Sequence, residues 1–162
     1  MTYSIRKIQP ADNLKVKEII ESVMTDFGCV GCGYSIDDPE VAAMSEHYQP
    51  PTAAFYVIEL NGVILGCGGI AQLKGGQSHI AELRKMYFLP ELRKLGVGSA
   101  LLKLCLKESR SMGYRYIYLE TMDNMAAARK LYQRFGFEDL KQPLGDTGHG
   151  SCNSWMGMEL IT

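Results

Sequence analysis

The sequence contains no apolar run that approaches the roughly 20 residues of a membrane-spanning helix, and residues 1–10 lack the apolar core of a signal peptide. It also lacks an excess of either charge, because 17 basic residues stand against 18 acidic ones. Net charge therefore gives no support for binding nucleic acid or an anionic membrane, and any anion site must be local. We expect a cytoplasmic protein with neither kind of partner.

The chain lacks the cysteine pattern of a disulfide scaffold. Its five cysteines are an odd number spread over a chain of 162 residues, which indicates reduced thiols. Cys29 and Cys32 have the spacing of half a zinc site or of a redox pair, but no second close pair of Cys or His completes a tetrahedral set. We therefore expect no metal, and we interpret the pair as small loop residues, with Cys67 and Cys105 filling the core.

What the sequence does contain is enough apolar material for one sizeable core, since 46% of its 162 residues are hydrophobic. No repeats or low-complexity tracts divide the chain. The whole of 1–162 is therefore predicted to form a single domain.

Hydrophobic periodicity predicts an α/β (α+β) fold of about seven strands and about four helices. The expected strands are 3–8, 54–60, 63–71, 78–89, 114–120, 137–140 and 155–160. The expected helices are 39–48, 97–113, 124–135 and one that starts at Pro10 and carries Leu14, Val16, Ile19, Ile20 and Val23. Asn61-Gly62 is a strong hairpin signal, so the centre of the sheet should be an antiparallel meander.

The segment 93–98, which reads RKLGVG, is the most informative of the chain. It follows a predicted strand and opens directly into an amphipathic helix. A helix N-terminus leaves about four backbone N–H groups unpaired and carries partial positive charge, so it can bind an anion. Gly96 and Gly98 let the backbone approach a phosphate, while Arg93 and Lys94 add positive charge. The alternative is a glycine turn of purely structural purpose.

Two motifs and the order of the predicted elements resemble the GNAT superfamily of N-acetyltransferases. Residues 86–98 look like the family's fourth strand and its RxxGxG loop, which binds the pyrophosphate of acetyl-CoA, and residues 124–137 look like its second motif. The resemblance covers roughly residues 81–138. Segments 83–87 and 148–155 also resemble a group of bacterial members with unnamed substrates. A Rossmann dinucleotide site is disfavoured, because no full GxGxxG is present.

The resemblance implies a mixed sheet of the GNAT fold and acetyl-CoA as cosubstrate. The residues expected to bind acetyl-CoA are Met86, Tyr87, Phe88, Arg93, Lys94, Leu95, Gly96, Val97, Gly98, Ser99, Asn124 and Tyr132. Lys94 stands where many members have glycine. Asn124 lies eight residues before Tyr132 rather than seven, so it either holds the cofactor arm or caps the helix.

The implied reaction is direct attack of a primary amine on the thioester, which requires a base because such an amine is mostly charged at neutral pH. Glu82 is the first candidate base and Glu120 the second. Strand alternation puts Glu82, Arg84, Met86 and Phe88 on one face unless a bulge intervenes. For Glu82 the alternative is a surface carboxylate paired with Arg84 or Lys85, and for Glu120 it is a cap or a salt bridge.

Tyr132 matches the family tyrosine that protonates the departing thiolate of coenzyme A. The alternative is that Tyr132 is only an aromatic residue packed in the core. A backbone N–H near Phe88 is expected to polarise the thioester carbonyl. His149 or His79 could relay a proton, although loop histidines, His47 among them, are usually only solvated. Further candidates for contact with the acceptor are Tyr34, Asp37, Asp38 and Trp155.

The predicted acceptor is the primary amine of a small molecule or amino-acid-like compound. The reason is that the glycine-rich loops in 28–51 and 142–153 are long enough to close over a groove. A protein N-terminus or lysine as acceptor, and a non-catalytic acyl-CoA-binding regulator, are the alternatives. The sequence leaves a homodimer open.

Overall fold

The computed structural model describes residues 2–29, 33–34, 36 and 38–161. Two residues considered above, Cys32 and Asp37, lie outside these ranges. Within them, no helix has both the length and the apolar character needed to cross a bilayer.

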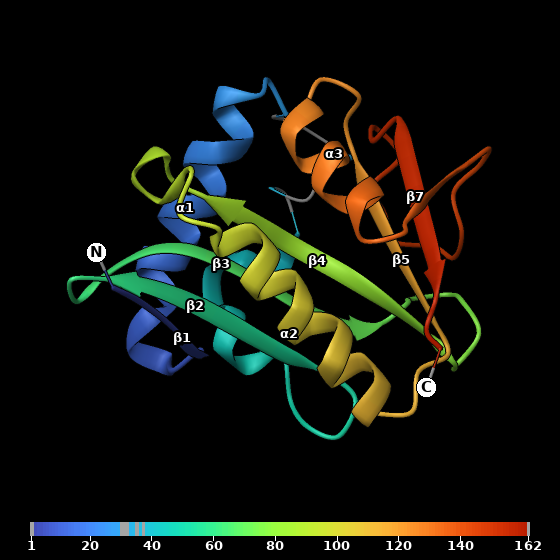
Figure 1. Ribbon diagram of the computed structural model, residues 1–162, viewed down its shortest axis with the longest axis horizontal. Helices are drawn as coiled ribbons and strands as arrows, with labels where there is room; N and C mark the ends of the chain where they lie inside the picture. The colour runs from blue at the N-terminus through green and yellow to red at the C-terminus, as the bar shows by residue number, and fades with distance from the viewer. Residues whose placement is uncertain (1, 30–32, 35, 37, 162) are drawn as a thin grey trace.

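In the part of the chain that the structure describes, seven strands form one mixed sheet, in agreement with the predicted number of about seven (Figure 1). They are β1 (Tyr3–Lys7), β2 (Ala54–Leu60), β3 (Val63–Gln72), β4 (Ile80–Phe88), β5 (Tyr116–Thr121), β6 (Glu138–Leu140) and β7 (Ser154–Glu159). The order in space is β1-β2-β3-β4-β5-β7-β6, and among these described strands the β4–β5 pair is parallel while the other pairs are antiparallel. The meander predicted from the Asn61-Gly62 turn is confirmed in β2, β3 and β4.

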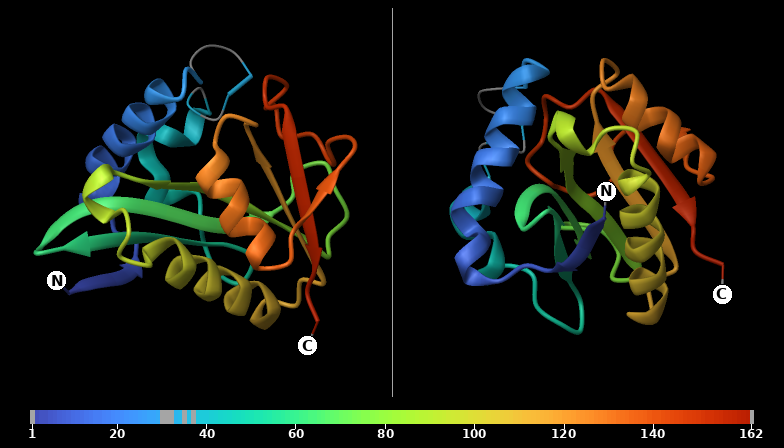
Figure 2. Two further views of the ribbon diagram at one scale, coloured as in Figure 1. Left: turned by 45° about the horizontal axis from the view of Figure 1, so that its top comes forward. Right: turned by 60° about the vertical axis from the view of Figure 1, so that its left-hand side comes forward.

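Helices cover both faces of the sheet (Figure 2). One face carries α1 (Asn13–Asp26) and η3 (Pro39–Glu46), a 3-10 helix, and the other carries α2 (Val97–Ser111) and α3 (Ala126–Arg134). Two short 3-10 turns, η1 (Pro10–Asp12) and η4 (Pro90–Leu92), precede α1 and α2. The predicted mixed sheet with four main helices is therefore found in the described part of the chain.

The apolar stripe of α1 differs from the prediction at one residue. Val16, Ile19, Ile20 and Val23 are buried against the sheet, but Leu14 is 69% exposed. Leu14 lies two residues before Val16, about half a helical turn away, so its side chain leaves the helix on the opposite side.

Each face of the sheet has its own hydrophobic core. The core on the α2 side includes Leu101, Leu102 and Cys105, and the core on the α1 side includes Ile19 and Cys67. Both cysteines are fully buried, as expected of core-filling residues. Together, the two cores fix the positions of the strands between them.

A β-bulge interrupts β4 at Lys85. The pairing with β3 shifts between Cys67 and Gly69, and Lys85 adopts a left-handed backbone conformation with φ 51°. An extra residue in a strand reverses the facing of all residues after it. The bulge therefore shifts the alternation of β4, so that residues after Lys85 point to the opposite face from the one that simple alternation predicts.

The bulge makes the simple alternation expected for β4 wrong. Arg84 lies on the α1 side, with its guanidinium 5.9 Å from the centre of the Tyr48 ring, and it binds Glu82. Met86 and Phe88 pack instead into the core on the α2 side. Glu82 and Arg84 thus do not share a face with Met86 and Phe88.

The parallel strands β4 and β5 separate along their length (Figure 1). Only residues 80–82 of β4 pair with β5, although β4 continues to Phe88 and β5 to Thr121. The later residues of β4 keep their pairing with β3 alone. This divergence opens a cavity at the middle of the sheet and exposes one edge of β4 to it.

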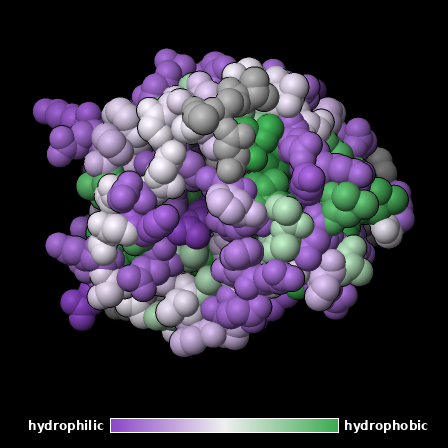
Figure 3. All heavy atoms as spheres, turned by 180° about the vertical axis from the view of Figure 1, so that it is seen from behind, coloured by the Kyte–Doolittle hydropathy of each residue, from purple (hydrophilic) through white to green (hydrophobic). Residues whose placement is uncertain are grey.

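The surface seen from behind is mainly hydrophilic, with apolar side chains in small separate areas (Figure 3). Among the described residues, the large apolar side chains with high exposure are Leu14, Val63 and Ile161. They come from three different parts of the chain. The prediction of a homodimer stays open.

Candidate active site

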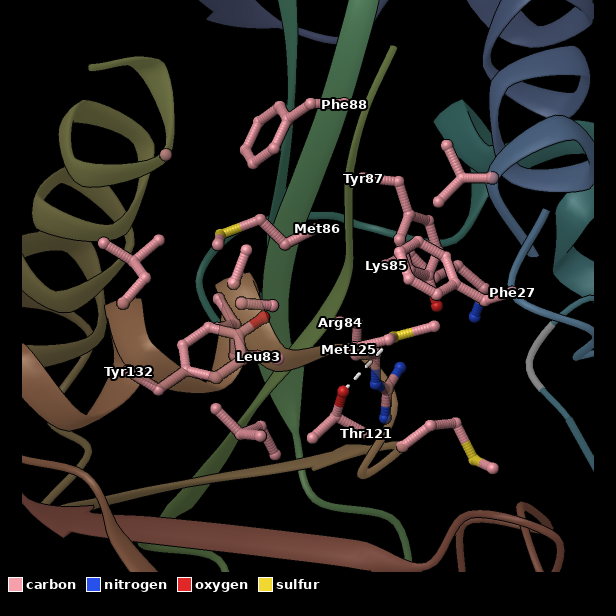
Figure 4. A pocket seen from close by; sticks show the side chains of 18 of the residues that line it. Phe27, Leu83, Arg84, Lys85, Met86, Tyr87, Phe88, Thr121, Met125 and Tyr132 are labelled. Atoms are coloured by element: carbon pink, nitrogen blue, oxygen red, sulfur yellow. Dashed lines mark hydrogen bonds between the residues drawn. The ribbon is translucent and has the colours of Figure 1, made fainter. Parts of the chain in front are cut away.

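A cavity of about 710 Å³ lies where β4 and β5 diverge. Its walls are the later part of β4, the end of β5, the start of α2, α3, the end of α1 and the loop before β7 (Figure 4). The predicted cofactor residues that line it are Met86, Tyr87, Phe88, Arg93, Lys94, Gly96, Val97, Gly98, Ser99, Asn124 and Tyr132. Leu95 is not among the lining residues, because its side chain packs against the core on the α2 side.

The glycine turn brings the N-terminus of α2 to this cavity. Gly96 precedes the helix with φ 76° and ψ 12°, a left-handed conformation that suits glycine, and no side chain caps the helix there. A side chain on Gly98 would press against Leu131, with its Cβ 3.0 Å from Cδ2 of that residue. Lys94 is also left-handed, with φ 65°, which explains why glycine suits this position in many family members. The first N–H groups of α2 are thus available to an anion.

Arg93→Ala is expected to raise the Kd for coenzyme A about fivefold. Arg93 is exposed at the cavity rim, so its attraction for a phosphate is worth about 1 kcal/mol at low salt. Isothermal titration calorimetry checks this, with Lys103→Ala as control, because Lys103 is an exposed cation of α2 that does not line the cavity. An equal loss of affinity in both variants would argue against a phosphate contact at Arg93.

Tyr132 extends from α3 into the cavity (Figure 4). Its ring is tilted against that of Phe137 with centroids 5.7 Å apart, and the residue is 6% exposed. Burial raises the pKa of its phenol well above the usual value of about 10. Tyr132 is therefore an aromatic residue of the core that also lines the cavity, and its role as the acid stays a prediction.

Asn124 connects two helices rather than capping one. Its side-chain amide donates a hydrogen bond of 3.1 Å to the carbonyl of Phe27, at the end of α1. The helix α3 begins at Ala126, with Met125 in the capping position, so the prediction of an N-cap at Asn124 is wrong. The bond ties the start of α3 to the opposite side of the cavity.

Glu82 is a buried carboxylate, only 3% exposed. Its Oε1 accepts a hydrogen bond of 2.7 Å from Nε of Arg84. Burial raises the pKa of Glu82 and outweighs the opposing effect of Arg84. The pairing with Arg84, given above as the alternative, is present, but the carboxylate lies in the cavity wall and not on the surface, and its role as the base stays a prediction.

Glu120, at the end of β5, faces the same cavity but has a different environment. It accepts hydrogen bonds from the Tyr118 hydroxyl at 2.7 Å and from the Thr147 hydroxyl, and Nδ1 of His149 lies 3.2 Å from its Oε1. Burial by itself would raise the pKa of Glu120, but the bonds from His149, Thr147 and Tyr118 outweigh burial and lower the pKa. Environments that push two carboxyl pKa values apart are typical of acid and base roles.

His149 lies at the centre of this site, and the sequence did not distinguish it from His79. Its Nε2 is 2.8 Å from Oδ2 of Asp38, on the far side from Glu120. Burial lowers the pKa of His149, but the two carboxylates outweigh burial and raise it to about 9. His79 and His47 are exposed and do not line the cavity.

The other residues considered for contact with the acceptor lie in different parts of the structure. Asp38 reaches the site through His149, whereas Trp155 lines a small separate cavity. Tyr34 packs against the core on the α1 side. Cys152, which the sequence did not single out, lines the main cavity, and burial raises the pKa of its thiol to about 12.

Lys85 is a buried cation that the sequence analysis missed as a site residue. Its side chain is 1% exposed, and Nζ lies 2.6 Å from Asp38 and 3.3 Å from Glu40. A lysine in the interior of a mostly apolar strand was the available signal, since such a charge needs partners. Through Asp38, Lys85 anchors the segment before η3 to β4.

Lys85→Ala is expected to lower the free energy of unfolding by about 3 kcal/mol, because it leaves two carboxylates without their buried partner. Chemical denaturation measures the change. Lys17→Ala is the control, since Lys17 pairs with Glu21 at 3.8 Å on the exposed side of α1 and its loss should cost at most about 0.5 kcal/mol. Equal stability of the two variants would contradict a structural role of Lys85.

Glu82, Glu120 and His149 place one ligand atom each within 4.8 Å of one another, a spacing that a metal ion can use. Both ring nitrogens of His149, however, lie against carboxylates. When both nitrogens donate hydrogen bonds, neither has a lone pair for a metal. This donor set suits proton transfer better than metal binding, and the absence of a metal stays a prediction.

Residues 17–137 match the acetyltransferase (GNAT) family. The chain belongs to the GNAT family. It is 37% identical over 157 residues to the uncharacterized N-acetyltransferase YjgM of Escherichia coli (strain K12), covering 96% of this chain and 94% of that one. A GNAT family member is an N-acetyltransferase, so the predicted enzyme class is confirmed.

Solved structures share the fold. A GNAT acetyltransferase from Staphylococcus aureus Mu50 superposes with a TM-score of 0.87 at 21% identity, covering 99% of this chain and 100% of that one. YncA from Salmonella typhimurium, solved with acetyl-CoA, has a TM-score of 0.79 at 21% identity, with coverage of 99% and 95%. Acetyl-CoA is thus a ligand in a protein of this fold.

Proposed function

We propose that this GNAT enzyme transfers the acetyl group of acetyl-CoA to the primary amine of a small molecule or amino-acid-like compound by direct attack. The observation that carries the proposal is that a carboxylate and a phenol, Glu82 and Tyr132, line one cavity. Glu82 lies in its wall on β4, and Tyr132 enters it from α3. A base for the amine and an acid for the thiolate are the two groups that the reaction needs.

The cofactor would lie along the exposed edge of β4. Its pyrophosphate would bind the N–H groups at the start of α2, with Arg93 and Lys94 at the rim. Beyond Glu82, the edge of β4 that faces the cavity makes no ladder with β5, so its N–H groups can bond the pantetheine arm and the thioester carbonyl.

The chemical step would require the nitrogen to lose two protons and the sulfur to gain one. Glu82, directly or through water, would take a proton from the ammonium group, and the amine would then form a C–N bond to the acetyl carbon as the C–S bond breaks. The nitrogen would lose its second proton to water, while Tyr132 would give its proton to the coenzyme A sulfur and regain one from solvent. A phenol keeps its proton at neutral pH, and burial strengthens that tendency.

A small acceptor is favoured because two loops meet at the acceptor side of the cavity. Ser151 donates a backbone hydrogen bond of 3.1 Å to the carbonyl of Gly33, and His149 contacts Asp38. An extended peptide would need an open groove there. Protein acceptors therefore rank below small amines.

The test is incubation of the protein with acetyl-CoA and a panel of small amines, amino acids and short peptides, with thiol release as the readout. Release above the no-acceptor rate with a small amine supports the proposal. A preference for peptides would favour protein acetylation. Tight binding of coenzyme A without release on any acceptor would favour a non-catalytic regulator.

A further inference from the structure

The loop before β7 contacts Gly33 and Asp38 of the segment after α1, although they are far apart in the sequence. The contacts are made by described residues of both segments. Ser151 N–H bonds the carbonyl of Gly33 at 3.1 Å, and His149 lies 2.8 Å from Asp38 across a separation of 111 residues. A side chain on Gly33 would collide with Ser151, with its Cβ 2.5 Å from Oγ, so the two loops approach as closely as glycine permits.

His149 lies between two carboxylates, one on each side of its ring. Nε2 is 2.8 Å and 2.9 Å from the two oxygens of Asp38, and Nδ1 is 3.2 Å from Glu120. An ionised carboxylate only accepts hydrogen bonds, so both ring nitrogens must carry a proton to satisfy both partners. That form is the imidazolium cation, and its two charge-assisted bonds are stronger than neutral ones.

We propose that His149 is a positioning residue that, as a cation bonded to Asp38 and Glu120 at once, holds the loop 148–153 against Asp38 on the acceptor side of the cavity and fixes Glu120 beside Glu82. We call Asp38, His149 and Glu120 the His149 bridge. Only the expected effect of His149 on binding of the acceptor rests on the proposed function. Its structural content, a charged histidine that joins two loops, stands independently.

The charges around the bridge agree with this role. The groups that face His149 are Asp38 and Lys85 on one side, Glu120 on β5 and Glu82 on β4. Lys85 opposes the charge of His149, while the two bonded carboxylates favour it and hold its pKa at about 9. Loss of the proton above that pH removes one of the two bonds, so the loops should open and the acceptor should bind less tightly.

The first measurement needs no turnover. The chain has three histidines, so the ring signals in the NMR spectrum of the carbon-labelled protein are few, and His149→Gln identifies the signal of His149. We expect it to titrate near pH 9 in the wild type and at least one pH unit lower in Asp38→Asn. An unchanged titration in Asp38→Asn, or one near the ordinary value of about 6.5, overturns the bridge.

The second measurement follows the loop. Hydrogen exchange of the amides in 148–153 at pH 7 should be at least tenfold faster in His149→Gln and in Asp38→Asn, after correction for intrinsic rates. His79→Gln is the control, because His79 is exposed and outside the cavity. Exchange that equals the wild type in both bridge variants overturns the proposal, and Asp38→Asn keeps the test valid if His149→Gln does not fold.

The third measurement uses an amine found in the acceptor panel. His149→Gln should raise the KM for the amine at least tenfold and leave the KM for acetyl-CoA unchanged. The fall of wild-type kcat/KM above about pH 9 should move to lower pH in Asp38→Asn. Loss of kcat alone, with the KM for the amine and the pH profile unchanged, overturns positioning. If no amine reacts while the first two measurements succeed, the proposed function fails and the bridge stands.

Discussion

Tyr132→Phe is expected to lower kcat at least 100-fold and to leave the Kd for coenzyme A within a factor of two. The substitution removes the only proton that Tyr132 could give to the leaving thiolate, and general acid catalysis contributes about 10²–10⁴ in rate. The ring itself remains, so its packing against Phe137 and its wall of the cavity are preserved. Steady-state kinetics and calorimetry with coenzyme A measure the two quantities separately.

The control for Tyr132→Phe is Tyr114→Phe. Tyr114 is another buried tyrosine, and its hydroxyl donates to the carbonyl of Thr52 at 2.6 Å, away from the cavity. Its loss should reduce stability and leave kcat nearly unchanged. Full activity of Tyr132→Phe would exclude the phenol as the acid, and weaker coenzyme A binding with normal kcat would reassign Tyr132 to cofactor binding.

Glu82→Gln is expected to lower kcat/KM for the amine by about 10²–10⁴ at neutral pH, because the amide cannot accept a proton. The pH profile gives the sharper result. Burial raises the pKa of Glu82 above its usual value near 4.5, so wild-type activity should rise as this carboxyl ionises and should fall away below that raised pKa. The ionisation of the amine affects wild type and variant alike, so the step that only the wild type shows belongs to Glu82.

Glu120→Gln tests which of the two carboxylates, Glu82 or Glu120, acts as the base. The hydrogen bonds that lower the pKa of Glu120 keep it ionised through the range in which Glu82 titrates, so Glu120→Gln should retain the acidic step in the profile. Loss of that step in Glu120→Gln and its survival in Glu82→Gln would assign the base to Glu120.

The local pattern of the sequence predicted the elements well, because each is encoded by neighbouring residues. The strand 54–60 and the start of α2 at Val97 were predicted at their observed positions. Boundaries moved where a turn intervenes, as in β4, which begins at Ile80 rather than residue 78. Leu14 was assigned to the wrong side of α1 because an apolar residue in the first turn resembles part of the stripe.

The sequence by itself determined the family, the glycine turn before α2 and the two chemical candidates Glu82 and Tyr132, since each depends on residue type at a fixed local spacing. Only the tertiary structure decided the facing of β4, because the bulge at Lys85 depends on pairing with β3. The contacts of His149 with Asp38 and Glu120 likewise join segments distant in the chain. No periodicity encodes such a contact, because its geometry arises only when the sheet brings those segments together.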